Sequence, residues 1–224
     1  AATALLPLPA AAKTAPARAD LLIRHATLVD VEHGRLIPDQ TVATQGDRIV
    51  AVGDDAAIAA AWRAGKNVEA KGRYLIPGLW DMHVHFGGGP DLIEENKALL
   101  PLYIANGITT VRGVPFASFD YSIKEKARSA KNEITAPRYS VYQRPGSGWD
   151  QGPVRTPDKA RTWVRWIAQN GADGLKVGAE RPDIMAALLD EAKKLGLGTT
   201  AHLAQTGVAQ MNADEATRLG LGTV

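Results

Sequence analysis

Short runs of alternating apolar and polar residues dominate the chain from Asp20 to Arg73. The runs LLIRHATLVDV, QTVATQG, RIVAVG and NVEAKGRYLI are separated by turn residues at 32–34 and 46–47. Alternation with a period of two is typical of half-buried strands. Only the Ala-rich segment 55–63 breaks the pattern, and it predicts a short helix. Residues 20–73 are therefore predicted to form a small β-sandwich domain.

The pattern changes at Tyr74, where predicted strands begin to alternate with predicted helices. The strands are YLIPGLWDMHVHF, GITTVRG, PRYSVY, GADGLKVG, LGTTAHL and LGTV, and the helices span 91–105, 118–130, 158–169, 182–195 and 211–219. A glycine stands where each helix should end in the repeated segments ANGITT, QNGADGLK, KLGLGTT and RLGLGTV. Strands and helices alternating at this spacing predict parallel βαβ units, in an α/β barrel or a doubly wound sheet.

Residues 1–19 form a separate segment that is rich in Ala and Pro and has no periodicity. Such a composition is typical of a disordered tail. The segment lacks the basic n-region and the long apolar h-region of an intact signal peptide. We interpret it as the front of a processed periplasmic or secreted protein, and a cytoplasmic protein is the alternative.

The amino-acid composition excludes several classes of protein function. The 224 residues contain no Cys, and 26 Lys and Arg stand against 24 Asp and Glu. The lack of Cys excludes disulfides, thiolate metal sites and cysteine nucleophiles. The charges are interspersed and give no basic stripe for nucleic acid, and no apolar run approaches the roughly 20 residues of a transmembrane helix. We therefore expect a small-molecule substrate and neither a nucleic-acid nor a membrane partner.

Polar side chains stand at the ends of three predicted strands. His83 and His85 are two residues apart, so they point to the same face of their strand. Lys176 lies between two apolar residues and faces away from them, into the interior of a barrel. His202 follows the next strand. Each residue alone has an ordinary structural explanation, but together they converge on the carboxyl ends of the strands, where parallel barrels bind ligands.

The segments IPGLWDMHVHF, GITTVRG, GLKVG and TTAHL, in this order, resemble the amidohydrolase superfamily of metal-dependent hydrolases. The likeness is greatest to its imidazolonepropionase-like and Xaa-dipeptidase-like branch, and it runs from about residue 20 to the end. It implies an α/β fold, a (β/α)8 TIM-like barrel preceded by the small β-sandwich domain. Residues 74–224 would then hold the first five to six βα units of a barrel that is incomplete in this chain.

The resemblance also implies a centre with two divalent metal ions. It makes His83, His85 and His202 metal ligands, and it makes Lys176 a carboxylated, catalytic lysine that bridges the two ions. Zinc is the expected metal. A hydroxide held between the ions would attack the carbonyl of a small amide, such as a dipeptide, an N-acyl amino acid, an aryl amide or a cyclic amide.

The sequence departs from the family at its end. The family has a further histidine on strand six and an aspartate on strand eight, whereas this chain stops at Val224, in the sixth predicted strand. Six strands do not close an eight-stranded barrel. We therefore expect a longer polypeptide or a barrel completed by a second subunit, and we expect a homo-oligomer. An inactive fragment and a non-enzymatic scaffold of the same fold are the alternative functions.

Three residues are predicted to contact substrate. The long connection QRPGSGWDQGPVR follows the third barrel strand and should lie over the mouth of the barrel, because βα loops form that face. Arg144 in this connection suits an anionic group. Arg112 and Tyr142 lie on neighbouring strands and are the other two predicted contacts, although each of the three also fits an ordinary solvated or structural role.

Overall fold

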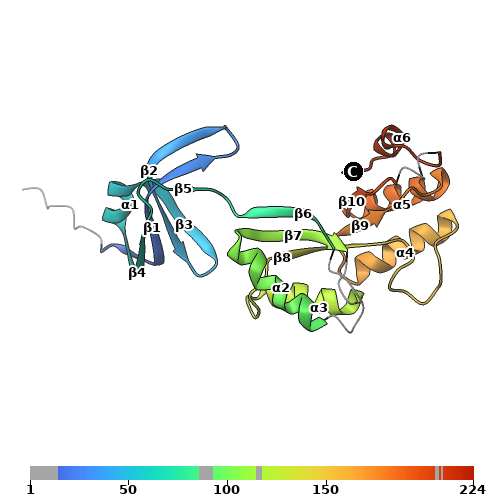
Figure 1. The fold of residues 1–224 in the computed structure, drawn as a ribbon, viewed down its shortest axis with the longest axis horizontal. Coiled ribbons are helices and arrows are strands. Elements are labelled where there is room, and N and C mark those ends of the chain that lie inside the picture. The colour runs from blue at the N-terminus through green and yellow to red at the C-terminus, as the bar shows by residue number, and fades with distance from the viewer. Residues whose placement is uncertain (1–14, 86–92, 115–117, 205–206, 208) are drawn as a thin grey trace, which may run out of the picture. The chain divides into compact units, whose positions relative to one another are not determined.

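The computed structural model describes residues 15–85, 93–114, 118–204, 207 and 209–224. They form two compact units that divide between Pro77 and Gly78 (Figure 1). Among the described residues, no helix combines the length and the apolar character that crossing a membrane requires.

The N-terminal unit is a five-stranded sheet with one short helix. Its elements are β1 (Ala17–Asp30), β2 (Arg35–Gln45), β3 (Arg48–Asp54), α1 (Asp55–Ala61), β4 (Trp62–Glu69) and β5 (Tyr74–Leu75). The central strand β1 pairs antiparallel with β2 and parallel with β4 and β5. The predicted strands and helix are present, but the described residues of this unit form one sheet, so the second layer of the expected sandwich is not among them.

The tail ends earlier than the sequence predicts. β1 begins at Ala17, so residues 17–19 belong to the sheet and not to the Ala- and Pro-rich segment. The buried Ala19 and Leu22 explain this, because they pack with Ala43 of β2 in the small core of the unit. Of the remaining predicted tail, residues 15–16 have no regular secondary structure, and residues 1–14 lie outside the described part of the chain.

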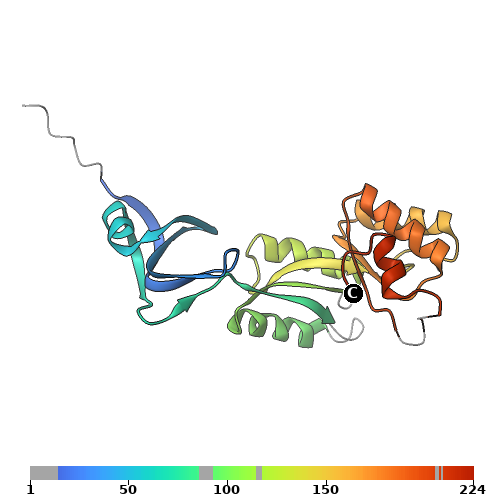
Figure 2. The same ribbon diagram turned by 90° about the horizontal axis from the view of Figure 1, so that it is seen from above.

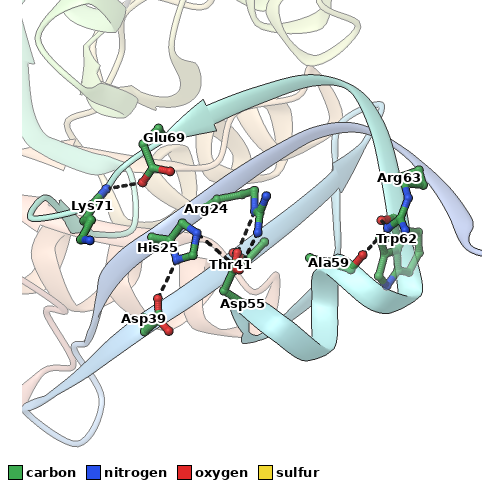
Figure 3. A network of polar contacts seen from close by, with 10 residues as sticks. All are labelled: Arg24, His25, Asp39, Thr41, Asp55, Ala59, Trp62, Arg63, Glu69 and Lys71. Atoms are coloured by element: carbon green, nitrogen blue, oxygen red, sulfur yellow. Dashed lines mark hydrogen bonds and ion pairs between the residues drawn. The ribbon is translucent and has the colours of Figure 1, made fainter.

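A polar network joins β1, β2 and the start of α1 (Figure 3). The buried carboxylate of Asp55 accepts hydrogen bonds from Arg24 Nε at 2.8 Å, from Arg24 Nη2 at 2.6 Å and from Thr41 Oγ1 at 2.6 Å. The two hydrogen bonds from the Arg24 guanidinium are the main reason that the pKa of Asp55 is lowered to about 2. This network fixes α1 on the sheet.

The C-terminal unit is a curled parallel sheet of five strands with helices between them (Figure 1). Its elements are β6 (Leu79–His85), α2 (Ile93–Ala105), β7 (Ile108–Val114), α3 (Phe119–Ala130), β8 (Arg138–Gln143), α4 (Pro157–Gln169), β9 (Gly174–Val177), α5 (Pro182–Lys194), β10 (Gly198–Ala201) and α6 (Ala213–Arg218). The strand order β6-β7-β8-β9-β10 follows the chain without a reversal, as in a barrel and unlike a doubly wound sheet (Figure 2). The predicted half-barrel is confirmed.

The sequence explains where the helices of this unit begin and what they bury. α4 begins at Pro157, and the side chain of Thr156 caps it by accepting a hydrogen bond from the Lys159 amide at 3.3 Å. The face of α4 that carries Trp163 and Ile167 is fully buried in the core. The predicted sixth strand, in contrast, is only a single parallel bridge between Thr223 and Thr200 of β10.

Candidate metal centre

The predicted metal-binding residues lie at the carboxyl ends of the parallel strands. His83 and His85 end β6, Lys176 is the last residue but one of β9, and His202 directly follows β10. The Nε2 atoms of His83 and His85 are 2.8 Å apart, and Lys176 Nζ is 3.2 Å from His83 Nε2. The His202 ring centroid is 6.3 Å from that of His83. The structure therefore brings these four side chains together, and their role as ligands remains a prediction.

The electrostatics of the cluster favour its neutral forms. Lys176 is only 7% exposed. Burial, together with the positive charges of Arg112 and Arg144, lowers the pKa of Lys176. The charge of Lys176, followed by burial, lowers the pKa of His83, while burial and then Arg144 lower the pKa of His85. Neutral imidazoles and amines carry the free lone pairs that bind metal ions.

A cavity of about 430 Å³ opens beside this cluster and is lined by His85, Lys176, His202, Arg144 and Glu180, among others. Burial raises the pKa of Glu180. Within the described part of the chain, neither the Arg144 guanidinium nor the Glu180 carboxyl group has a hydrogen-bond or ion-pair partner. Glu180 is not among the residues predicted from the sequence, because the loop between β9 and α5 has no alternation to show where a side chain points. Its position in a βα loop is the one sequence feature that indicates a place near the site.

Comparisons with known proteins bear on this half-barrel. No family model matches the chain. Adenine deaminase 3 of Rhizobium meliloti (strain 1021) is 37% identical over 94 residues, which cover 42% of this chain and 15% of the relative. Imidazolonepropionase of Arthrobacter sp. (strain FB24) is 28% identical over 155 residues, 67% of this chain and 38% of the relative. The crystal structure of a putative prolidase from Bifidobacterium longum matches 90% of this chain and 52% of its own, with a TM-score of 0.70 and 20% identity.

These similarities support the amidohydrolase superfamily. The resemblance inferred from the histidine pair, the strand lysine and their order along the chain is confirmed. The matched part spans 15% and 38% of the two curated relatives, so the chain covers well under half of their length.

Arg112 and Tyr142 do not line the cavity of about 430 Å³. Both line a smaller pocket together with His83, His85 and Lys176. Arg112 is 9% exposed, and its guanidinium carbon is 5.2 Å from the centre of the Tyr142 ring. The same ring packs over Gly198, where an added Cβ would clash with the Tyr142 oxygen. Arg112 and Tyr142 therefore also contact other protein groups, and Arg144 lines the cavity of about 430 Å³. The substrate contacts of all three residues stay a prediction.

The donor atoms of the cluster decide which metal it fits. In the described ranges, no three His, Cys, Asp or Glu side chains come together as a metal-binding group. The cluster instead consists of the His83 and His85 imidazoles and the Lys176 amine, with the His202 imidazole nearby. Imidazole nitrogens suit zinc and its transition-metal neighbours better than magnesium or calcium. The residues present therefore fit part of a zinc-type centre.

Proposed function

We propose that the protein is a metal-dependent hydrolase that cleaves a C–N bond in a small amide. One observation carries the proposal: Lys176 of β9 is 93 residues from His83 of β6, yet its Nζ lies 3.2 Å from His83 Nε2. His83 Nε2 in turn lies 2.8 Å from Nε2 of His85 on the same strand. They do so at the carboxyl ends of parallel strands, where barrels of this type bind their ligands. The names of the related enzymes, a deaminase, an imidazolonepropionase and a prolidase, support the same class of reaction.

The four cluster residues have distinct roles in this proposal. His83, His85 and His202 would hold divalent ions, and Lys176 would join them as a carboxylated lysine. Bound zinc supplies Lewis acidity and lowers the pKa of a water molecule. Burial of Lys176 prepares it for this role, because only a neutral amine reacts with carbon dioxide to give a carbamate.

The cavity suggests how substrate is oriented. Arg144 is exposed on its wall, and its guanidinium has no partner among the described residues, so it can donate two parallel hydrogen bonds to a carboxylate. We therefore propose that the amide carries an anionic group next to Arg144. A dipeptide, an N-acyl amino acid and a carboxylated aryl amide all meet this condition, whereas a neutral cyclic amide does not.

Metal binding is the first test. The protein is treated with a chelator, dialysed, and titrated with Zn²⁺ by calorimetry. We expect His83→Ala and Lys176→Ala each to weaken binding at least tenfold. His33→Ala is the matched control, because His33 is exposed in the N-terminal unit and hydrogen-bonds Asp30. Equal Zn²⁺ affinity in all four proteins would contradict the proposed centre.

Turnover is the second test. A panel of dipeptides, N-acyl amino acids, aryl amides and cyclic amides is incubated with the zinc-loaded protein, and release of the amine is measured. We expect activity that Lys176→Ala abolishes and Arg144→Met reduces only for anionic substrates. Zinc binding without turnover of any amide would favour the inactive fragment or the non-enzymatic scaffold.

A further inference from the structure

The backbone next to His83 departs from the regular ladder between β6 and β7. The pairing passes from Asp81 opposite Val111 to Val84 opposite Gly113. Two residues of β6, Met82 and His83, therefore lie opposite a single residue of β7, and this residue is Arg112 by its position between Val111 and Gly113. Such a β-bulge disrupts the local ladder and turns the side chain that it carries.

Two side chains hydrogen-bond the peptide group at this bulge. The carbonyl oxygen of Met82 accepts a hydrogen bond from Arg112 Nε at 2.9 Å. The amide of His83, which belongs to the same peptide group, donates to Asp81 Oδ1 at 3.1 Å. Both polar atoms of the Met82–His83 peptide thus have a side-chain partner, which fixes the plane from which the His83 side chain projects.

The remaining donors of Arg112 reach the other side of the half-barrel. Nη2 donates to Thr200 Oγ1 on β10 at 3.3 Å, and Nη1 donates to Thr223 Oγ1 at 3.1 Å. Thr200 pairs with Lys176 in the sheet and stands two residues before His202. The buried guanidinium of Arg112 therefore hydrogen-bonds the peptide group that precedes His83 and also the strand that His202 follows.

We propose that Arg112 is a positioning residue of the metal centre, which sets the direction of His83 through the bulged peptide and the position of His202 through Thr200. Asp81 assists at His83 alone. The inference rests on the proposed function, because it assigns a purpose to the same cluster. A guanidinium suits this role because its planar fork holds several acceptors in fixed directions, which a lysine ammonium does not.

The first experiment uses the metal-free protein, so that it does not depend on metal binding. Long-range proton–nitrogen spectra report the imidazole environments of His83 and His202, with His33 as the internal reference. We expect Arg112→Met to shift the signals of both histidines, and Asp81→Ala to shift those of His83 only. Arg181→Met is the matched control, because Arg181 is an exposed cation paired with Asp183, and it should shift neither.

The second experiment loads the same variants with Co²⁺, whose visible spectrum reports the arrangement of the ligands. We expect Arg112→Met to change the spectrum and to weaken binding at least tenfold, and Arg112→Lys to recover part of the affinity. A role confined to stability would lower the unfolding midpoint without changing the spectrum of the folded fraction. If Arg112→Met does not fold, Asp81→Ala and Thr200→Val test the two halves of the proposal separately.

The outcomes are distinguishable. Unchanged imidazole signals of His83 and His202 in Arg112→Met, or in Asp81→Ala and Thr200→Val, would overturn the positioning role. If the unaltered protein binds neither Zn²⁺ nor Co²⁺, the proposed function fails, and the metal-free spectra still decide whether Arg112 positions the two histidines.

Discussion

The carboxylate of Asp55 should make the N-terminal unit sensitive to acid. Its side chain is buried and accepts three hydrogen bonds from Arg24 and Thr41, as Figure 3 shows. The folded-state pKa is about 2, whereas the ordinary value is 3.8. One pKa unit corresponds to about 1.4 kcal/mol, so ionisation of Asp55 contributes about 2 kcal/mol to the free energy of unfolding. The Arg24 side chain is 34% exposed, and solvent screening of the ion pair makes the contribution somewhat smaller.

The direction of the effect follows from the lowered pKa. This contribution is fully present above the unfolded-state pKa near 4, and it is lost as the pH falls toward 2. The Asp55→Asn variant keeps the size of the side chain but cannot ionise. It should therefore unfold more easily than the unaltered protein at pH 7, by about 2 kcal/mol, and the difference should vanish near pH 2.

Hydrogen exchange followed by mass spectrometry is a suitable assay, because peptides from β1 and β2 report the N-terminal unit separately. Exchange is measured between pH 7 and pH 2.5 and corrected for intrinsic rates. Asp47→Asn is the matched control, since Asp47 is exposed and forms an ion pair with Arg48 at 3.5 Å. If the β1 amides of Asp55→Asn exchange at pH 7 as slowly as those of the unaltered protein, the reasoning is refuted.

Three further predictions concern the C-terminal unit. Lys176→Met should raise the free energy of unfolding of the metal-free protein by about 1 kcal/mol while abolishing zinc binding, because it removes a buried amine; a loss of stability in denaturant titrations would argue against this. Gly198→Ala should lower the unfolding midpoint, and Tyr142→Phe should partly restore it by removing the oxygen that clashes with the new Cβ. Trp163→Ala should cost about 3–5 kcal/mol in urea unfolding, because Trp163 is fully buried; a cost below about 1 kcal/mol would contradict the packing described.

The sequence was sufficient for the architecture because periodicity and turn residues act locally. The alternation that ends at His83 and His85 correctly implies that both imidazoles share a face, since their Nε2 atoms are 2.8 Å apart. The apolar neighbours of Lys176 likewise imply an inward amine, and it is buried beside His83. The single sheet of the N-terminal unit, in place of the predicted two-layer sandwich, was not foreseeable in this way, because alternation shows that strands have two faces but not what covers each of them.

Arg112 shows where such reasoning ends. It stands near the carboxyl end of its strand, and this position alone suggests a substrate contact. The extra residue in β6 opposite it cannot be read from alternation, because a bulge changes the pairing without changing the hydrophobic pattern. Once the bulge is known, the Met82 carbonyl is an acceptor within 2.9 Å of Arg112 Nε, and a buried guanidinium gains more from such fixed acceptors than from an open cavity. The role of Arg112 therefore follows from the backbone and side-chain acceptors that its guanidinium hydrogen-bonds. Its position on the strand shows only that it lies near the predicted metal centre.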